Sequence, residues 1–249
     1  MEVHNGCRSL VQTRAKRLEN GGEWFGTSTD IDELRRLKER QEVLLKELHH
    51  RTGNLLAVIA SIARRTAQSS DSVEIFSQRF EDRIQALSRV QAQIARDSGP
   101  IELGVLVRME LDALGLSGTG RISTKGPLNC LLNPKQAETL ALAIHELGTN
   151  ALKHGALAGE AGQLSVTWSC PPQGERYFEW VETGVTNGPI NTARRGYGRE
   201  LIEIALPYAL GAQTRLVFDE PGTVRCTIGL PVAEAMYFSD PLSLAAGKE

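Results

Sequence analysis

The chain has 249 residues, of which 23% are charged and 41% hydrophobic, enough to bury the core of one large domain or two small ones. Its net charge of −2 argues against binding nucleic acid through bulk positive charge. No apolar run approaches the ~20 residues of a membrane helix, and the first ten residues contain no apolar signal-peptide core. The four cysteines (Cys7, Cys130, Cys170 and Cys226) are widely spaced without a CxxC pair, which excludes a recognisable zinc ribbon and favours a reducing compartment. We therefore expect a cytoplasmic protein.

The first thirty residues have the pattern of strands and turns. Residues 8–18 alternate and are rich in β-branched side chains, residues 19–22 form a turn cluster, and residues 23–27 could return as a second strand. Two strands cannot make an independent domain. They are either the end of a larger domain or packed against another part of the protein.

Two amphipathic helices are predicted next. A heptad seam begins after Asp30, and its apolar spacing continues to about Ala67. A polar break at residues 69–71 precedes a second helix that ends near Asp97. Two antiparallel helices with a short connection form a hairpin, and two hairpins form a four-helix bundle. The seam comprises Leu34, Leu37, Gln41, Leu44 and Leu48, and the stripe of the second helix comprises Phe76, Phe80, Ile84, Leu87, Val90 and Ile94.

The segment after Pro100 alternates between helical and strand-like patterns. It predicts an α+β sandwich in which one sheet packs against helices. A glycine-rich loop is expected over residues 183–198, and the tail after Pro231 has no clear period. The predicted helices are 103–114, 134–154 and 200–209, and the predicted strands are 121–125, 164–169, 177–181, 214–218 and 224–230.

His50 is the first candidate for chemistry. At 100° per residue it lies opposite the apolar seam of its helix, on the face of Asn54, Ala57 and Ser61. Small neighbours such as Ala57 let another surface approach. The residue is either a solvated histidine on an amphipathic helix or a nucleophile, since a neutral imidazole carries a free lone pair.

A second candidate is the polar face of the helix predicted at 134–154. Glu146, Asn150 and Lys153 stand at i, i+4 and i+7, opposite the apolar stripe. An amide oxygen can ligate Mg²⁺, and an ammonium group can meet phosphate. The alternative is an ordinary solvated helix face.

The third candidate joins a strand end to the glycine-rich loop. Glu182 at the end of a strand could accept a hydrogen bond from an exocyclic amine such as that of adenine, or be a surface acid. Gly196 and Gly198 before a helix could let backbone N–H groups approach a phosphate, although a plain loop gives the same pattern.

The order of four motifs carries a family resemblance. The chain resembles the HWE family of bacterial sensor histidine kinases, a close relative of the HisKA2 group, over about residues 30–231. The family is named for a histidine and a Trp-x-Glu motif, here His145, Trp180 and Glu182. The four motifs are Leu48-His49-His50-Arg51-Thr52-Gly53-Asn54-Leu55-Leu56, His145-Glu146-Leu147-x-x-Asn150-Ala151-x-x-x-Gly155-Ala156-Leu157, Trp180-x-Glu182-x-Gly184 and Gly196-x-Gly198-x-x-Leu201-Ile202. We call the second motif the N box.

The resemblance implies the domain order. Residues 30–98 would be the dimerisation and histidine-phosphotransfer hairpin, and residues 99–232 the α/β-sandwich ATP-binding domain of the GHKL type. Residues 1–29 resemble the last strands of a PAS sensor domain, and residues 233–249 would be a tail. It further implies a homodimer, ATP and Mg²⁺ as cofactors, and a response-regulator receiver domain as partner.

The resemblance also implies a role for each site residue. His50 would be the phosphoacceptor, Glu146 the acid that acts at the γ-phosphate, and Asn150 the Mg²⁺ ligand. Lys153 would contact phosphate, and Glu182 would read the adenine amine. The remaining nucleotide-binding candidates are His154 in the N box, Gly184, Gly196 and Gly198 around the ATP lid, and Arg194, Arg195 and Arg199 as phosphate partners.

Two departures from the family pattern leave the activity open. Thr52-Gly53 stand where the family usually has Val-Lys, and the glycine-proline segment after Trp-x-Glu is lengthened to residues 184–189. These changes suit either an autophosphorylating histidine kinase or, alternatively, a phosphatase or nucleotide-gated scaffold for a receiver domain. The helical hairpin in front argues against a serine/threonine kinase or a gyrase-like ATPase.

Overall fold

A computed structural model describes residues 3–4, 7–8, 11–17, 24–97, 99–172, 174–185, 197–219 and 222–231. The chain divides into two compact units, Met1–Ser61 and Ile62–Glu249, and each is described by itself. Within the described residues, no helix combines the length and apolar character needed to cross a membrane.

The first unit begins with two small antiparallel pairs. Strand β1 (Val3–His4) pairs with β2 (Cys7–Arg8), and β3 (Val11–Arg17) pairs with β4 (Trp24–Asp30). The predicted return strand is therefore confirmed and extends to Asp30. The assignment of this region to the end of a PAS domain stays a prediction.

Helix α1 (Asp32–Gln68) carries its apolar seam on an exposed surface in the first unit. The Asp30 carboxylate accepts the Asp32 N–H at 3.0 Å at the start of the helix. Ion pairs between i and i+4 positions, such as Arg35–Glu39 at 2.8 Å, support its outer face. The leucines of the predicted seam, namely Leu34, Leu37, Leu44 and Leu48, remain 58–68% exposed.

The second unit starts with the last turns of α1 and helix α2 (Val73–Asp97), which are separated at the predicted polar break. Helix α2 packs against α3 (Leu103–Ala113) and α4 (Pro134–Lys153). Its buried stripe includes Ala86, Leu87 and Val90. Two helices with a short connection were predicted here, and both are present.

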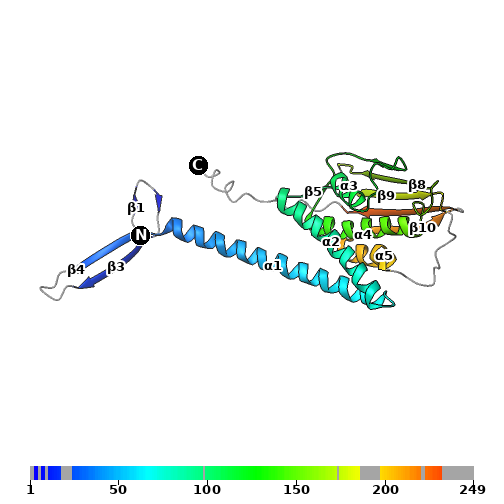
Figure 1. Cartoon of the computed structure of the whole chain (residues 1–249). Helices are drawn as coiled ribbons and strands as arrows, with labels where there is room; N and C mark the ends of the chain where they lie inside the picture. The colour runs from blue at the N-terminus through cyan, green and yellow to red at the C-terminus, as the bar shows by residue number, and fades with distance from the viewer. Residues whose placement is uncertain are drawn as a thin grey trace. The chain divides into compact units, whose positions relative to one another are not determined.

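A five-stranded sheet forms the other layer of this unit (Figure 1). All neighbours are antiparallel except β6 and β8, which are parallel. Alternate side chains of β8 and β9, including Val166, Phe178 and Trp180, are buried, and a Cβ on Gly148 of α4 would lie 3.8 Å from the Trp180 ring. The predicted α+β sandwich is confirmed. The strand order is β10 (Gln213–Asp219), β11 (Thr223–Leu230), β9 (Arg176–Thr183), β8 (Gln163–Ser169) and β6 (Ile122–Lys125).

In the second unit the structure differs from the predicted elements in two places. The pair β5 (Ile101–Glu102) and β7 (Leu131–Leu132) was not predicted, because two-residue strands leave no periodic pattern. The helix predicted at 200–209 is α5 (Tyr197–Glu200), a π-helical turn (Leu201–Ala205) and α6 (Leu206–Leu210). Pro207 lacks an N–H, and the adjacent Leu206 N–H bonds to Leu201 five residues back. Most of the predicted glycine-rich loop, and the tail, lie outside the described residues.

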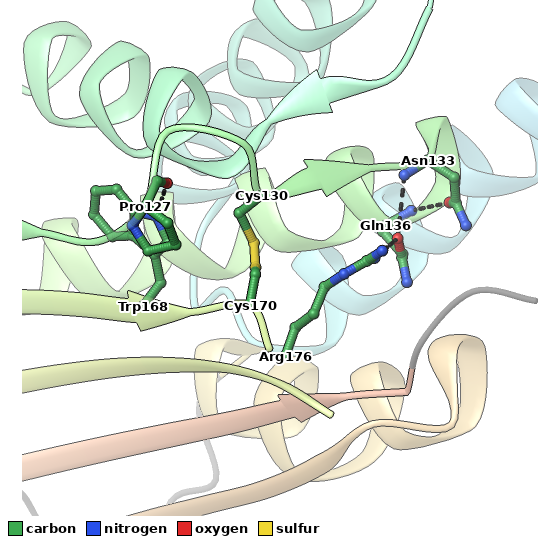
Figure 2. Close-up of a disulfide and its surroundings, with 7 residues drawn as sticks. All are labelled: Pro127, Cys130, Asn133, Gln136, Trp168, Cys170 and Arg176. Atoms are coloured by element: carbon green, nitrogen blue, oxygen red, sulfur yellow. Dashed lines mark hydrogen bonds between the residues drawn. A yellow bond between two sulfur atoms is a disulfide. The ribbon is translucent and has the colours of Figure 1, made fainter. Parts of the chain in front are cut away.

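The start of α4 is anchored to the sheet (Figure 2). The Asn133 side chain accepts the Gln136 N–H at 2.9 Å, and the Gln136 side chain accepts the Asn133 N–H at 3.1 Å, forming a capping box. A disulfide joins Cys130, just before β7, to Cys170, just after β8, with Cα atoms 5.6 Å apart. The sequence favoured reduced cysteines because it contains no CxxC pair, and this expectation is wrong for Cys130 and Cys170. The two cysteines are 40 positions apart, so their spacing did not indicate a pair.

Candidate functional site

The polar face of α4 lies where the sequence places it. The stripe Leu140, Ile144 and Leu147 is at most 3% exposed and forms the core. On the other side the Glu146 side chain is 13% exposed, and Asn150, Lys153 and His154 are exposed. His154 is the C-terminal cap residue, so Lys153 and His154 stand at the end of the helix.

Helix α5 brings a glycine against this face. A Cβ on Gly198 would lie 3.2 Å from Glu146 Oε2 and 3.3 Å from Asn150 Nδ2, which is tighter than most real contacts. A glycine therefore fits there without displacing either side chain. Arg199 pairs with Glu203 at 2.8 Å within the same segment. Arg194, Arg195 and Gly196 lie outside the described residues.

Glu182 sits beneath the end of the N box and is 3% exposed. Its Oε1 accepts the Trp180 indole N–H and its Oε2 accepts the Ala156 N–H, both at 2.9 Å. Burial raises the pKa of Glu182, and the two hydrogen bonds partly offset that rise. A Cβ on Gly155 would collide with the Glu182 carboxylate, which explains the glycine that follows α4.

Gly184 continues the chain after Glu182. Its φ of +78° is a backbone conformation that glycine adopts readily, and a Cβ would lie 3.1 Å from the Gly162 Cα. Strand β9 ends at Thr183, and Gly184 follows it shortly before residues 186–196, which lie outside the described part of the chain.

His50 belongs to the first unit and is exposed on α1. Asn54, one turn later, places its Nδ2 3.4 Å from His50 Nδ1. Glu47, one turn before His50, pairs with Arg51 at 2.6 Å. The imidazole is accessible on the face opposite the seam, as predicted.

Known proteins resemble this chain in sequence. The family model of the HWE histidine kinases matches residues 47–128. A blue-light-activated histidine kinase of Rhizobium johnstonii is 31% identical over 204 residues, covering 80% of this chain and 57% of that protein. One of Brucella anthropi is 29% identical over 240 residues, covering 94% and 48%. These matches support the assignment of the chain to the HWE histidine kinase family. It spans about half the length of these relatives.

A solved structure extends the likeness to the fold. The histidine kinase domain of a blue-light-activated histidine kinase from Erythrobacter litoralis superposes with a TM-score of 0.51 at 18% identity, covering 70% of this chain and 94% of that domain. The fold of this chain is therefore a helical segment followed by a GHKL-type sandwich.

The N box is also tied to α2 by an arginine that sequence reasoning missed. The Arg83 side chain is 4% exposed, and its Nε donates to Glu146 Oε1 at 2.7 Å. Its Nη1 donates to Thr66 Oγ1 at 2.7 Å, and its Cζ lies 3.6 Å from the centroid of the Tyr197 ring. Burial raises the pKa of Tyr197 to about 12, although the Arg83 charge opposes the rise. A signal was available, because Arg83 falls within the apolar stripe of α2.

A second buried cluster lies one residue earlier in the N box. Arg89 donates from two nitrogens to the fully buried Glu110 of α3, at 3.2 and 2.6 Å. His145 Nδ1 lies 3.4 Å from Glu110 Oε2, and it makes no hydrogen bond within the described part of the chain. This cluster joins α2, α3 and α4, and it lies within the core rather than on the polar face.

The residues near Gly198 fit a cation that arrives with a nucleotide. Among the described residues, no group of three or more His, Cys, Asp or Glu side chains could hold a metal alone. Glu146 and Asn150 supply oxygen donors, which Mg²⁺ prefers, and Gly198 packs closely beside them. Phosphate oxygens would have to complete such a site.

Proposed function

We propose that this HWE kinase uses ATP and Mg²⁺ to phosphorylate His50, and then passes the phosphoryl group to an aspartate of a response-regulator receiver domain. The observation that carries the proposal is the meeting of Glu146, Asn150 and the Gly198 backbone on one face. A carboxylate and an amide one helical turn apart, under a glycine, suit the phosphates of a bound nucleotide.

The nucleotide site would be divided among the described elements. Asn150, with Glu146 beside it, would hold Mg²⁺, which neutralises charge on the phosphates when bound. Lys153 and His154 at the end of α4 would face the phosphates. Each carboxylate oxygen of Glu182 accepts one hydrogen bond and keeps a second lone pair. That lone pair could accept a hydrogen bond from the adenine amine. Gly184, Arg195, Gly196 and Arg199 would complete the lid.

The phosphoacceptor needs an accessible nitrogen. His50 is exposed, and the nitrogen of its neutral imidazole that carries no proton supplies the lone pair of the nucleophile. Accessibility matters twice, because the same imidazole must meet the γ-phosphate and later the receiver aspartate.

The exposed seam of α1 supports a homodimer. Leu34, Leu37, Leu44 and Leu48 repeat at heptad spacing, and an isolated helix of this length has no apolar partner in water. A second copy would cover the seam in a four-helix bundle.

Labelling with radioactive ATP tests the proposal. We expect an acid-labile label that requires Mg²⁺ and is lost in His50→Gln and in Asn150→Ala. His49→Gln is the matched control, since it removes the neighbouring imidazole and should keep the label. Stable labelling of His50→Gln would refute the acceptor assignment. Faster loss of phosphate from a phosphorylated receiver, without any label on this chain, would instead support the phosphatase alternative.

A further inference from the structure

Arg83 contacts both the acid of the N box, Glu146, and the segment that contains Tyr197. Its ion pair holds the Glu146 carboxylate, and its guanidinium stacks on Tyr197. Tyr197 is the residue before Gly198, which packs closely against Glu146 and Asn150. One buried cation therefore both neutralises the acid of the N box and fixes the segment that lies over it.

Breaking the contacts of this cluster costs free energy. Arg83 and Glu146 are almost fully withdrawn from water, and separating a buried pair leaves an uncompensated charge. A second ion pair, Arg65–Glu200 at 2.8 Å, also holds α5, in this case to the end of α1. It is more exposed, at 27% and 35%, and contributes less. Both pairs join the hairpin helices to the nucleotide-binding side.

Resting on the function proposed above, we propose that the cluster of Arg83, Glu146 and Tyr197 is an inhibitory latch. While it is closed, Glu146 is held by Arg83 and cannot act at a γ-phosphate, and α5 is fixed through Tyr197. When it opens, the carboxylate and α5 are released in one event, because both depend on the same guanidinium. Arg83 is thus a positioning residue that acts through Glu146, and movement of α2 or of the end of α1 would control it.

The test uses the full chain with Arg83→Met, which keeps the length of the side chain and removes its charge. We expect the initial rate of ATP-dependent labelling to rise by at least about fivefold. We also expect the backbone amides of residues 197–200 to exchange hydrogen faster without nucleotide. Arg89→Met is the matched control. It also removes a charge from α2, but this charge pairs with the buried Glu110 of α3 and not with Glu146. It should change neither measurement.

Slower or unchanged labelling together with unchanged exchange at residues 197–200 would overturn the latch. If Arg83→Met does not fold, Tyr197→Leu removes the stacking without leaving a buried charge, and the same two results are expected. The exchange measurement needs no chemistry. A wild-type chain that never labels would therefore refute the proposed kinase activity, while the exchange result would still decide the latch.

Discussion

Helix α4 and the first part of α1 carry apolar stripes of the same spacing but have different surroundings. On α4, Leu140 and Ile144 are completely buried against the rest of their unit. On α1, Leu37 and Leu44 are each 58% exposed. Periodicity therefore predicts a helix and the direction of its apolar face in both cases, and it does not reveal what covers that face. The stripe of α4 stabilises this chain, whereas that of α1 is available to another one.

The sharpest test of this contrast is truncation in the buried stripe. Ile144→Ala should lower the free energy of unfolding of residues 62–249 by about 2–5 kcal/mol, because it leaves a cavity in a closed core. Urea unfolding followed by tryptophan fluorescence measures this, since Trp168 and Trp180 are buried in the same unit.

The matched change on α1 is Leu44→Ala. It should alter the same free energy of unfolding by less than about 0.5 kcal/mol, and it should weaken self-association as measured by light scattering. Equal losses of unfolding free energy in the two variants would break the comparison.

Reduction of the disulfide should come next in size. Cleaving Cys130–Cys170 frees a loop that contains all of α4, and the expected loss is about 2–4 kcal/mol. Urea unfolding with and without dithiothreitol measures it, and the double variant Cys130→Ala/Cys170→Ala should be insensitive to the reductant.

Alkylation of the folded chain tests the pairing itself. Cys226 serves as an internal control, because burial raises the pKa of its thiol to about 12 and should keep it unalkylated in the folded chain. Rapid alkylation of Cys130 without reductant would contradict the pairing.

A single methyl group should disturb the junction between α4 and Glu182. In Gly155→Ala the new Cβ would meet the Glu182 carboxylate and lie 2.7 Å from the Ala151 Cα, so we expect a loss of about 1–3 kcal/mol. Gly159→Ala is the matched control, since nothing lies within 4 Å of its Cβ position. Thermal unfolding compares the two, and similar midpoints would show that the junction adapts.

The smallest expected effect is a pH dependence from Glu182. Burial raises the pKa of Glu182 in the folded chain, so the folded state holds this proton more tightly than the unfolded state does. The resulting stabilisation is present below the ordinary carboxyl pKa and is lost as the pH rises through the folded value. The free energy of unfolding of the wild type, minus that of Glu182→Gln, should therefore fall as the pH rises above 4.5, the ordinary pKa of this carboxyl group. A difference that grows with pH would show that hydrogen bonding to the carboxylate outweighs burial.

Helices α1, α2, α3 and α4 and the longer strands could be predicted because their signal is local. Apolar residues repeat at helical or strand spacing, and breakers such as Asp71 and Pro134 mark the boundaries. The candidate positions on α4 followed from the same periodicity, since Glu146 and Asn150 stand opposite the core stripe. The short strands β5 and β7 could not be found, because two residues define no period.

The sequence by itself determined the order of the elements, the family motifs and the residues that face away from each core. Only the tertiary structure decided which distant groups meet. Arg83 and Glu146 are 63 positions apart, and Cys130 and Cys170 are 40 apart. The physical reason is that periodicity depends on near neighbours along one element, whereas the pairing of a buried charge depends on how separate helices pack and exclude water from it.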